Sequence, residues 1–129
     1  MIRVWVDDWQ MQCCGQPFRV GDRVEWATDG LDRDYVQSVL GQQLAATVTH
    51  HEEHHADDGR ETAPVGGMVK AIHAVRCRYA PRTNGPTETR YPVEGTTELR
   101  TVDHADGWET EDSAMRFVAY LVDLEDGPT

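Results

Sequence analysis

Within the first 26 residues, two stretches place apolar side chains at every second position. Ile2, Val4 and Val6 share one parity, and the alternation resumes from residue 18 to residue 26 after a turn-forming Cys-Cys-Gly-Gln-Pro segment. A period of two is typical of β-strands, because successive side chains point to opposite faces of a sheet. This stretch therefore predicts two strands joined by a tight connection, and it directs the chain towards folds built on a sheet.

Further strands are predicted in the second half of the chain. Residues 68–80 have apolar side chains on both faces, and the segment Met115 to Leu124 is almost entirely apolar, as expected of central strands. Between them, residues 81–97 hold an Asn-Gly pair and three prolines, which predict a loop or an irregular edge hairpin. A short strand is expected around Leu99 and Val102.

One short helix interrupts this β pattern. Tyr35, Val36, Val39 and Leu40 fall at helical spacing, which predicts an amphipathic helix over about 33–41. Five or six strands without crossover helices favour a mainly β fold. We expect one domain spanning residues 1–129, a small antiparallel SH3-like β-barrel with this short α-helix inserted between its second and third strands. A His/Asp-rich insertion is expected at about 50–66.

Composition limits the classes of partner. Twelve Lys and Arg against 23 Asp and Glu give a formal charge of −11, which disfavours nucleic acid because the phosphates would be repelled. No apolar run approaches the roughly 20 residues of a membrane span, and the start of the chain lacks the apolar core of a signal peptide. An odd count of three Cys favours reduced thiols. We therefore expect an acidic cytoplasmic protein that does not bind a membrane.

Three segments together resemble a bacterial domain family of unknown function. They are VWVDDWQMQCCG near the start, a Val-rich strand ending in CRYAP, and the C-terminal FVAYLVDLED. The resemblance covers most of the chain, and the first segment is specific because Asp-Asp-Trp and Cys-Cys rarely occur together. It implies a single domain and carries no reaction, cofactor or partner.

The segment HHEEHH is the strongest chemical signal in the chain. It matches the H-E-x-x-H signature of zinc hydrolases and also its reversed form, as a tract of only His and Glu does by composition. The β-branched residues before it favour a strand, and Ala-Asp-Asp-Gly follows directly, so the apolar helix of a protease is not expected. Either a surface transition metal, with zinc as the cofactor, or a solvated tract fits. The candidate metal ligands are His50, His51, His54 and His55.

Aromatic and thiol side chains supply the candidate ligand site. Among the tryptophans, Trp9 follows the end of the alternation and is expected to be exposed, whereas Trp5 and Trp26 are expected in the core. Adjacent cysteines can form a strained ring, bind a soft metal, or pack as small hydrophobic groups; the last is favoured, and Cys77 is expected in the core. The candidate ligand-binding residues are Trp9, Cys13, Cys14 and Tyr79.

No catalytic signature accompanies these residues. Phosphate-binding loops, nucleophile elbows and a Ser-His-Asp order are missing from the sequence, so an enzyme is not expected on balance. The sequence predicts a binding or interaction module for a protein or small-molecule ligand. The alternative is a transition-metal-binding or metal-dependent protein that uses the HHEEHH tract.

Overall fold

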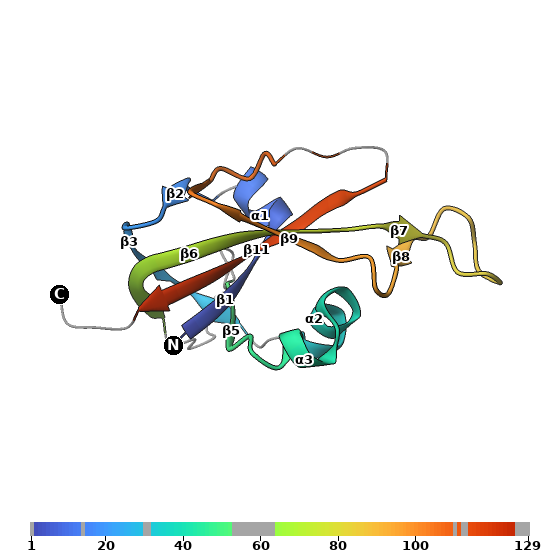
Figure 1. Cartoon of the computed structure of the whole chain (residues 1–129), viewed down its shortest axis with the longest axis horizontal. Helices are drawn as coiled ribbons and strands as arrows, with labels where there is room; N and C mark the ends of the chain where they lie inside the picture. Colours follow the sequence, from blue (N-terminus) through green and yellow to red (C-terminus); the bar gives the residue numbers. More distant parts are fainter. Residues whose placement is uncertain are drawn as a thin grey trace.

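A seven-stranded sheet forms the centre of the molecule. The computed structural model describes residues 2–13, 15–29, 32–52, 64–109, 111 and 114–125. The strand order is β3-β6-β11-β1-β5-β4, and β9 pairs with β6 (Figure 1). The strands are β1 (Ile2–Asp7), β3 (Arg23–Trp26), β4 (Thr28–Asp29), β5 (His50–Glu52), β6 (Val65–Cys77), β9 (Glu98–Val102) and β11 (Arg116–Glu125).

The predicted central strand is confirmed. β11 lies between β6 and β1 and pairs antiparallel with both, and eight of its ten residues are buried, which explains its continuous apolar run. The long strand predicted at 68–80 is also present as β6, although it begins earlier, at Val65. The predicted short strand around Leu99 is β9.

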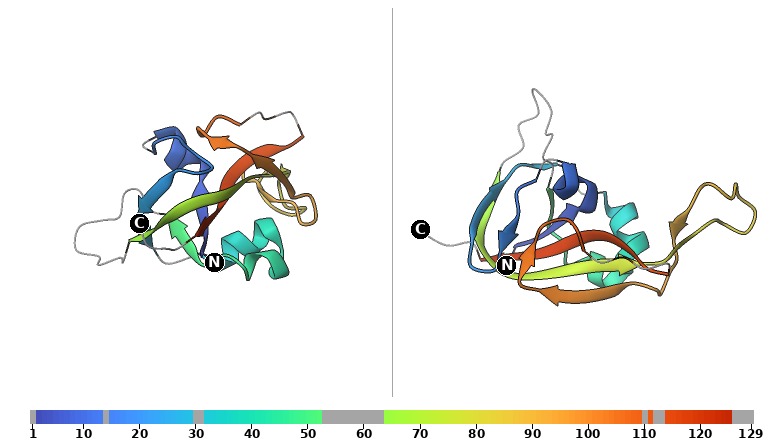
Figure 2. Two further views of the ribbon diagram at one scale, coloured as in Figure 1. Left: turned by 60° about the vertical axis from the view of Figure 1, so that its left-hand side comes forward. Right: turned by 90° about the horizontal axis from the view of Figure 1, so that it is seen from above.

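The sheet curls into a half-barrel and carries a core on each face (Figure 2). One face packs Val4, Val6 and Tyr120 against Phe18 of β2 (Phe18–Arg19) and Ala105 of β10 (His104–Ala105), two strands that form a small separate sheet. The opposite face, which includes Trp5, Val75 and Leu121, is covered by two helices. These are α2 (Arg33–Leu40) and α3 (Gln42–Ala45).

The structure corrects the prediction of a purely antiparallel barrel with one helix. β5 pairs parallel with β1, and three helices are present among the described residues. The mainly β class is confirmed, and so is the predicted helix at 33–41, which begins after the capping side chain of Asp32 and ends at Gly41 with φ of 83°. A further helix, α3, follows directly on Gly41.

The tight connection predicted after the first strand is wrong. Residues 8–13 form a one-and-a-half-turn helix, α1 (Asp8–Cys13), which turns Met11 into the core of the half-barrel. Gly15 ends this turn, since its amide donates to the carbonyl of Gln10 and a Cβ at position 15 would lie 2.9 Å from the Met11 sulfur. Helix α1 thus needs tertiary contacts that local turn chemistry does not reveal.

A hairpin arm extends beyond the end of the sheet. Residues 78–93, called the arm below, contain β7 (Tyr79–Ala80) paired with β8 (Tyr91–Pro92), and the Val93 amide donates to the Arg78 carbonyl at 2.8 Å. This confirms the irregular hairpin predicted there. Figure 1 and the right-hand view of Figure 2 show the arm projecting past the sheet on the side where α2 lies. In the described part of the chain, no helix is long and apolar enough to cross a membrane.

Candidate functional site

The end of β1 places a buried carboxylate at the centre of a polar cluster. The Asp7 side chain accepts a hydrogen bond from the Trp5 indole N–H at 2.8 Å, and its other oxygen lies 2.5 Å from Nε2 of His51. Asp7 is only 7% exposed. The parallel pairing of β5 with β1 brings His51 beside Trp5, so this contact depends on the strand arrangement rather than on proximity in the chain. Trp5 and His51 thus hold Asp7 in one orientation.

The next residue, Asp8, is partly buried at the start of α1. Burial raises the pKa of the Asp8 carboxyl, while the Trp9 backbone amide and the Arg116 guanidinium oppose this shift. The Arg116 guanidinium also lies 5.2 Å from the centre of the Tyr79 ring. Asp8, Arg116 and Tyr79 thus influence one another electrostatically at this end of the sheet.

Two tyrosines join this cluster to α2. The Tyr35 and Tyr79 hydroxyls lie 3.1 Å apart, and the Tyr35 ring meets the Trp5 ring edge-on with centroids 5.9 Å apart. Burial, more than any other effect, raises the pKa of both tyrosines, and the shift for Tyr35 is large. Both phenols are therefore neutral hydrogen-bonding groups at physiological pH.

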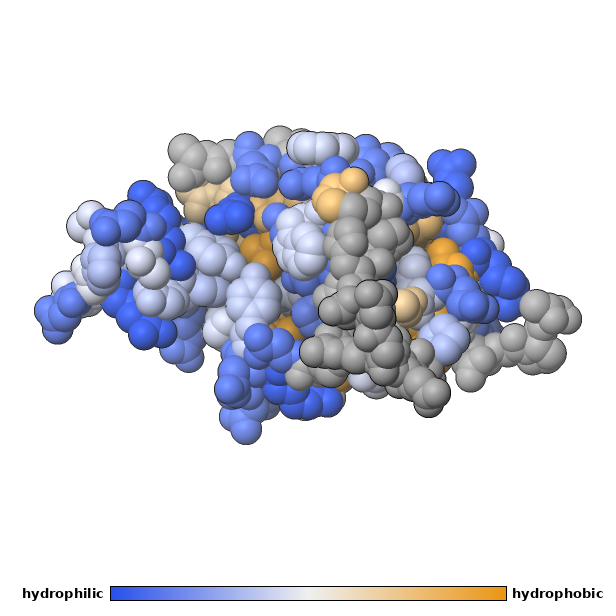
Figure 3. Space-filling model, turned by 180° about the vertical axis from the view of Figure 1, so that it is seen from behind, coloured by the Kyte–Doolittle hydropathy of each residue, from blue (hydrophilic) through white to orange (hydrophobic). Residues whose placement is uncertain are grey.

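A groove opens between α2 and the arm. The cavity has a volume of about 540 Å³, and we call it the tyrosine groove because Tyr35, Tyr79 and Tyr91 line it. A second cavity of about 750 Å³ continues along α2 and shares three of its lining residues, which are Asp34, Ser38 and Pro92. Figure 3 shows the arm as a largely hydrophilic projection at the left edge of the molecule, separated from the body by paler side chains.

Two arginines of the arm contribute to the wall of the tyrosine groove. Arg82 and Arg90 line it, and the Arg82 guanidinium stacks on the Tyr91 ring at 3.9 Å from the ring centre. Within the described ranges neither arginine forms an ion pair. The groove therefore combines apolar ring faces, phenol hydroxyls and exposed cations.

The predicted ligand-binding residues are dispersed. Tyr79 lines the tyrosine groove, whereas Trp9 is 49% exposed on α1 and does not line that cavity. Cys13 is disulfide-bonded, which contradicts the expected reduced thiol at this position. Cys14 lies outside the described residues. The binding roles predicted for Trp9 and the two cysteines stay predictions.

The other aromatic and thiol predictions can be checked directly. Trp5 is fully buried, as predicted, and Trp26 is half-buried against Phe18, with ring centroids 5.1 Å apart. Cys77 is a free thiol in the core, as predicted, and burial raises its pKa to about 11. A buried neutral thiol of this kind is chemically inert.

The first part of the HHEEHH tract is a strand. His50, His51 and Glu52 form β5, so a helix presenting His51 to zinc does not begin there. Successive strand residues point to opposite faces, and the contacts agree: His51 meets Asp7, whereas Nδ1 of His50 bonds the Thr49 hydroxyl at 2.8 Å. His54 and His55 lie outside the described residues. Among the described residues no three potential metal ligands gather.

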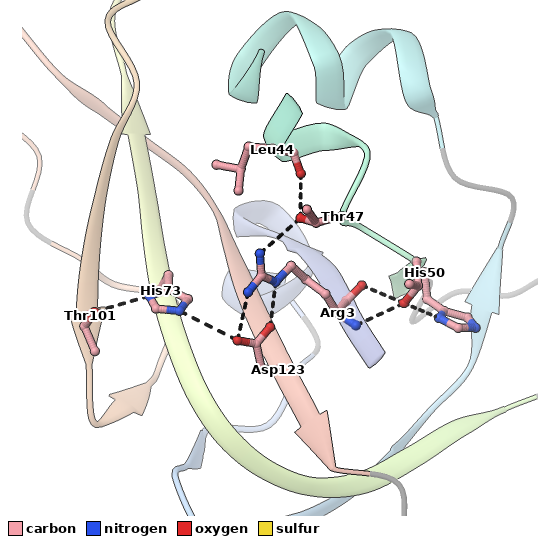
Figure 4. A network of polar contacts seen from close by, with 8 residues as sticks. Arg3, Leu44, Thr47, His50, His73, Thr101 and Asp123 are labelled. Atoms are coloured by element: carbon pink, nitrogen blue, oxygen red, sulfur yellow. Dashed lines mark hydrogen bonds and ion pairs between the residues drawn. The ribbon is translucent and has the colours of Figure 1, made fainter. Parts of the chain in front are cut away.

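A second polar network crosses the sheet near the edge of the helical cover (Figure 4). Arg3 of β1 makes two hydrogen bonds to Asp123 of β11, at 2.6 and 3.1 Å, which raise the pKa of Arg3. His73 of β6 lies 3.9 Å from the same carboxylate and bonds the Thr101 hydroxyl of β9 at 3.2 Å. Since these contacts link four adjacent strands, we assign this network to stability.

Sequence reasoning missed three parts of the site. Tyr35 was recognised only as an apolar helix position, and Asp7 only as a polar strand position. The basic arm was missed because charge was counted over the whole chain. A count by segment would have found it, since residues 78–93 hold three Arg and one Glu.

Comparisons with known proteins bear on the family alone. The curated proteins and the solved structures gave no match. A model described as a family of unknown function, DUF6578, matches residues 1–126. The three segments on which the resemblance rested belong to β1 with α1, to β6 with β7, and to β11, the strands that meet at the cluster described above. The chain therefore belongs to this family of unknown function.

Proposed function

We propose that this chain is a binding module whose ligand site is the tyrosine groove. The observation that carries the proposal is that three partly buried tyrosines line one cavity between two separate elements, α2 and the arm. Its volume of about 540 Å³ is typical of ligand sites, which range from about 300 to 1,000 Å³. Tyrosine supports such a role because one ring offers an apolar face and a polar tip.

The walls of the groove are held in place before any ligand arrives. The Thr97 hydroxyl donates to the Val39 carbonyl at the end of α2, and the Arg78 amide at the base of the arm donates to the Thr96 hydroxyl at 3.0 Å. The hydroxyl contact between Tyr35 and Tyr79 joins the two walls across the floor. Preorganisation of this kind lowers the entropy that a ligand must offset on binding.

Two other predictions are not part of this proposal. Kinship with SH3-like barrels stays a prediction, because the sheet is a half-barrel with one parallel pair. A zinc site in the HHEEHH tract also stays a prediction, since two of its four histidines lie outside the described residues. The groove needs neither of them.

The proposal is tested by a fragment screen followed in amide NMR spectra. We expect fragments with an aromatic or carboxylate group to shift the amides of residues 34–38 and 79–93 at millimolar concentration. Tyr91→Ala should weaken the best fragment by about tenfold, because it removes a ring from the groove without touching either core cluster. Trp108→Ala is the matched control, since Trp108 is exposed and lines a different cavity.

Two results would overturn the proposal. The first is a screen in which no fragment shifts the groove amides. The second is a screen whose shifts gather around Trp9 or Trp108, which would move the site to another surface.

A further inference from the structure

We infer that the ligand of the tyrosine groove is an acidic peptide segment of a partner protein. The inference rests on the proposed function and adds the chemistry of the ligand. The net positive charge of the arm, the exposed arginines of the groove and the second cavity along α2 support this ligand class.

Charge is divided unevenly between the arm and the rest of the chain. The arm carries Arg78, Arg82 and Arg90 against Glu88, a net charge of +2, so the remainder of the chain carries −13. Figures 1 and 2 show that the arm projects beyond the sheet, and its three arginines are exposed. The arm is therefore a local cationic surface on an acidic molecule.

The two arginines of the groove are available to bind carboxylates of a ligand. Exposed Arg82 and Arg90 have no ion-pair partner in the described part of the chain, although the sequence contains 23 Asp and Glu. Stacking on Tyr91 restricts the Arg82 guanidinium, so less side-chain entropy is lost when a carboxylate binds it. The planar guanidinium forms paired hydrogen bonds with carboxylates, which adds directional recognition to the attraction of charge.

The shape and charge of the groove favour a peptide over other anions. Asp34 lines both cavities along α2 and Glu94 lines the second, so negative groups of any ligand are disfavoured there and are favoured only at the arm, where Arg82 and Arg90 lie. This suits a ligand whose negative groups can be held apart from the rest of its length, rather than a compact dianion such as phosphate. A long nucleic acid would have to lie near a remainder that carries −13 and would be repelled. A short peptide can place its carboxylates at the arm and extend its chain along α2 through the second cavity.

The test measures binding of two labelled octapeptides by fluorescence anisotropy. One has the sequence Gly-Glu-Glu-Leu-Glu-Glu-Leu-Gly, and the other has Gln in place of every Glu. We expect the Glu peptide alone to bind at about 50 mM salt, to weaken as salt is raised, and to shift the amides of residues 34–42 and 79–93. The double variant Arg82→Glu, Arg90→Glu should bind it about tenfold more weakly.

The matched control is Arg19→Glu, Arg23→Glu, which makes the same change in net charge on β2 and β3, away from the groove. Its affinity should stay within about twofold of the unchanged chain. Circular dichroism checks that both double variants are folded.

The outcomes separate this inference from the proposed function. Equal binding of the two peptides, or an equal loss in both double variants, overturns the acidic ligand while leaving groove binding intact. The same holds if neither peptide binds but neutral fragments still occupy the groove. If oligothymidylate or inorganic phosphate binds the groove more tightly than the Glu peptide does, the inference of a peptide ligand is wrong, and the ligand belongs to the class of the tighter probe. If fragments fail as well, the proposed function itself is wrong.

Discussion

At the scale of single residues, the contacts around Asp7 combine burial with charge. The carboxylate accepts the Trp5 indole N–H and meets His51 while almost fully removed from solvent. Removing one partner of a buried polar group leaves the other without compensation, which is more costly than the net gain from the bond itself. Asp7 therefore stabilises the end of β1 at which the candidate site begins.

We expect Asp7→Ala to lower the free energy of unfolding by about 2 to 3 kcal/mol, because the Trp5 N–H and the His51 ring both lose their acceptor. Asp7→Asn keeps an acceptor for Trp5 and should cost about half as much. Urea unfolding followed by tryptophan fluorescence measures both. An alanine variant as stable as the unchanged chain would show that these contacts contribute nothing.

The partly buried carboxyl of Asp8 makes the stability of the folded chain depend on pH in a known direction. Its pKa is raised in the folded chain, so the folded state binds this proton more tightly than the unfolded state. The stability that this provides is present at low pH and is lost as pH rises through the folded pKa. Asp8→Asn mimics the protonated form, so it should stabilise the chain at pH 7 and have no effect at a pH below the ordinary value near 3.8.

The expected gain for Asp8→Asn is small, at most about 0.5 kcal/mol, because solvent screens a group that is not fully buried. Urea unfolding at neutral and at acidic pH measures the difference. Asp103→Asn, which removes an exposed carboxylate, controls for the change in net charge. A gain that persists unchanged at acidic pH would contradict this account of Asp8.

At the scale of elements, the curl of β6 depends on close backbone approach. A Cβ added at Gly67 would lie 2.5 Å from the carbonyl oxygen of Glu125 on β11, and the pairing of the two strands is irregular at Asp123 and Leu124. An irregularity of this kind bends a strand and increases its twist. Gly67 therefore allows the sheet to close towards β3 and form a half-barrel.

Gly67→Ala should destabilise the chain by about 2 kcal/mol or more, because backbone rather than a flexible side chain must move. Gly85→Ala in the arm is the control, since the nearest atoms to its Cβ, at 3.5 Å, are in ordinary contact. Thermal unfolding of the two variants compares them directly. Equal melting temperatures would show that β6 has room for a side chain at Gly67.

At the scale of the whole molecule, the arm is a separate addition to a two-faced core. Neither core cluster includes a residue of the arm other than Tyr79, which packs at its base. The arm also has a net positive charge, whereas the remainder of the chain has a net negative charge. We therefore expect the sheet to determine whether the chain folds, and the groove beside the arm to determine whether it binds a ligand.

Replacing residues 82–89 by Asn-Gly should change the free energy of unfolding by less than about 1 kcal/mol, because no buried apolar side chain is removed. The same variant should lose the Glu peptide, since Arg82 is deleted and one wall of the groove is shortened. Thermal unfolding and peptide anisotropy measure the two effects. A shortened arm that unfolds the chain would contradict the separation of folding from binding.

The sequence by itself determined the elements whose signal is local. The alternation in β1, the continuous apolar run of β11 between two paired strands, and the helical spacing in α2 each report which face of an element is buried. The same reasoning identified Tyr79 as a candidate ligand residue, and the structure places it in the tyrosine groove. It also predicted that Trp5 and Cys77 are buried.

Only the tertiary structure decided which segments of the chain lie next to one another. Helix α1, whose Met11 packs into the half-barrel, lies where the sequence predicted only a tight connection between two strands. The parallel pairing of β5 with β1 carries His51 to Asp7 across 44 positions of the chain. The groove, likewise, is a space between α2 and the arm. Local patterns report burial, whereas pairing and cavities depend on distant segments that no local pattern encodes.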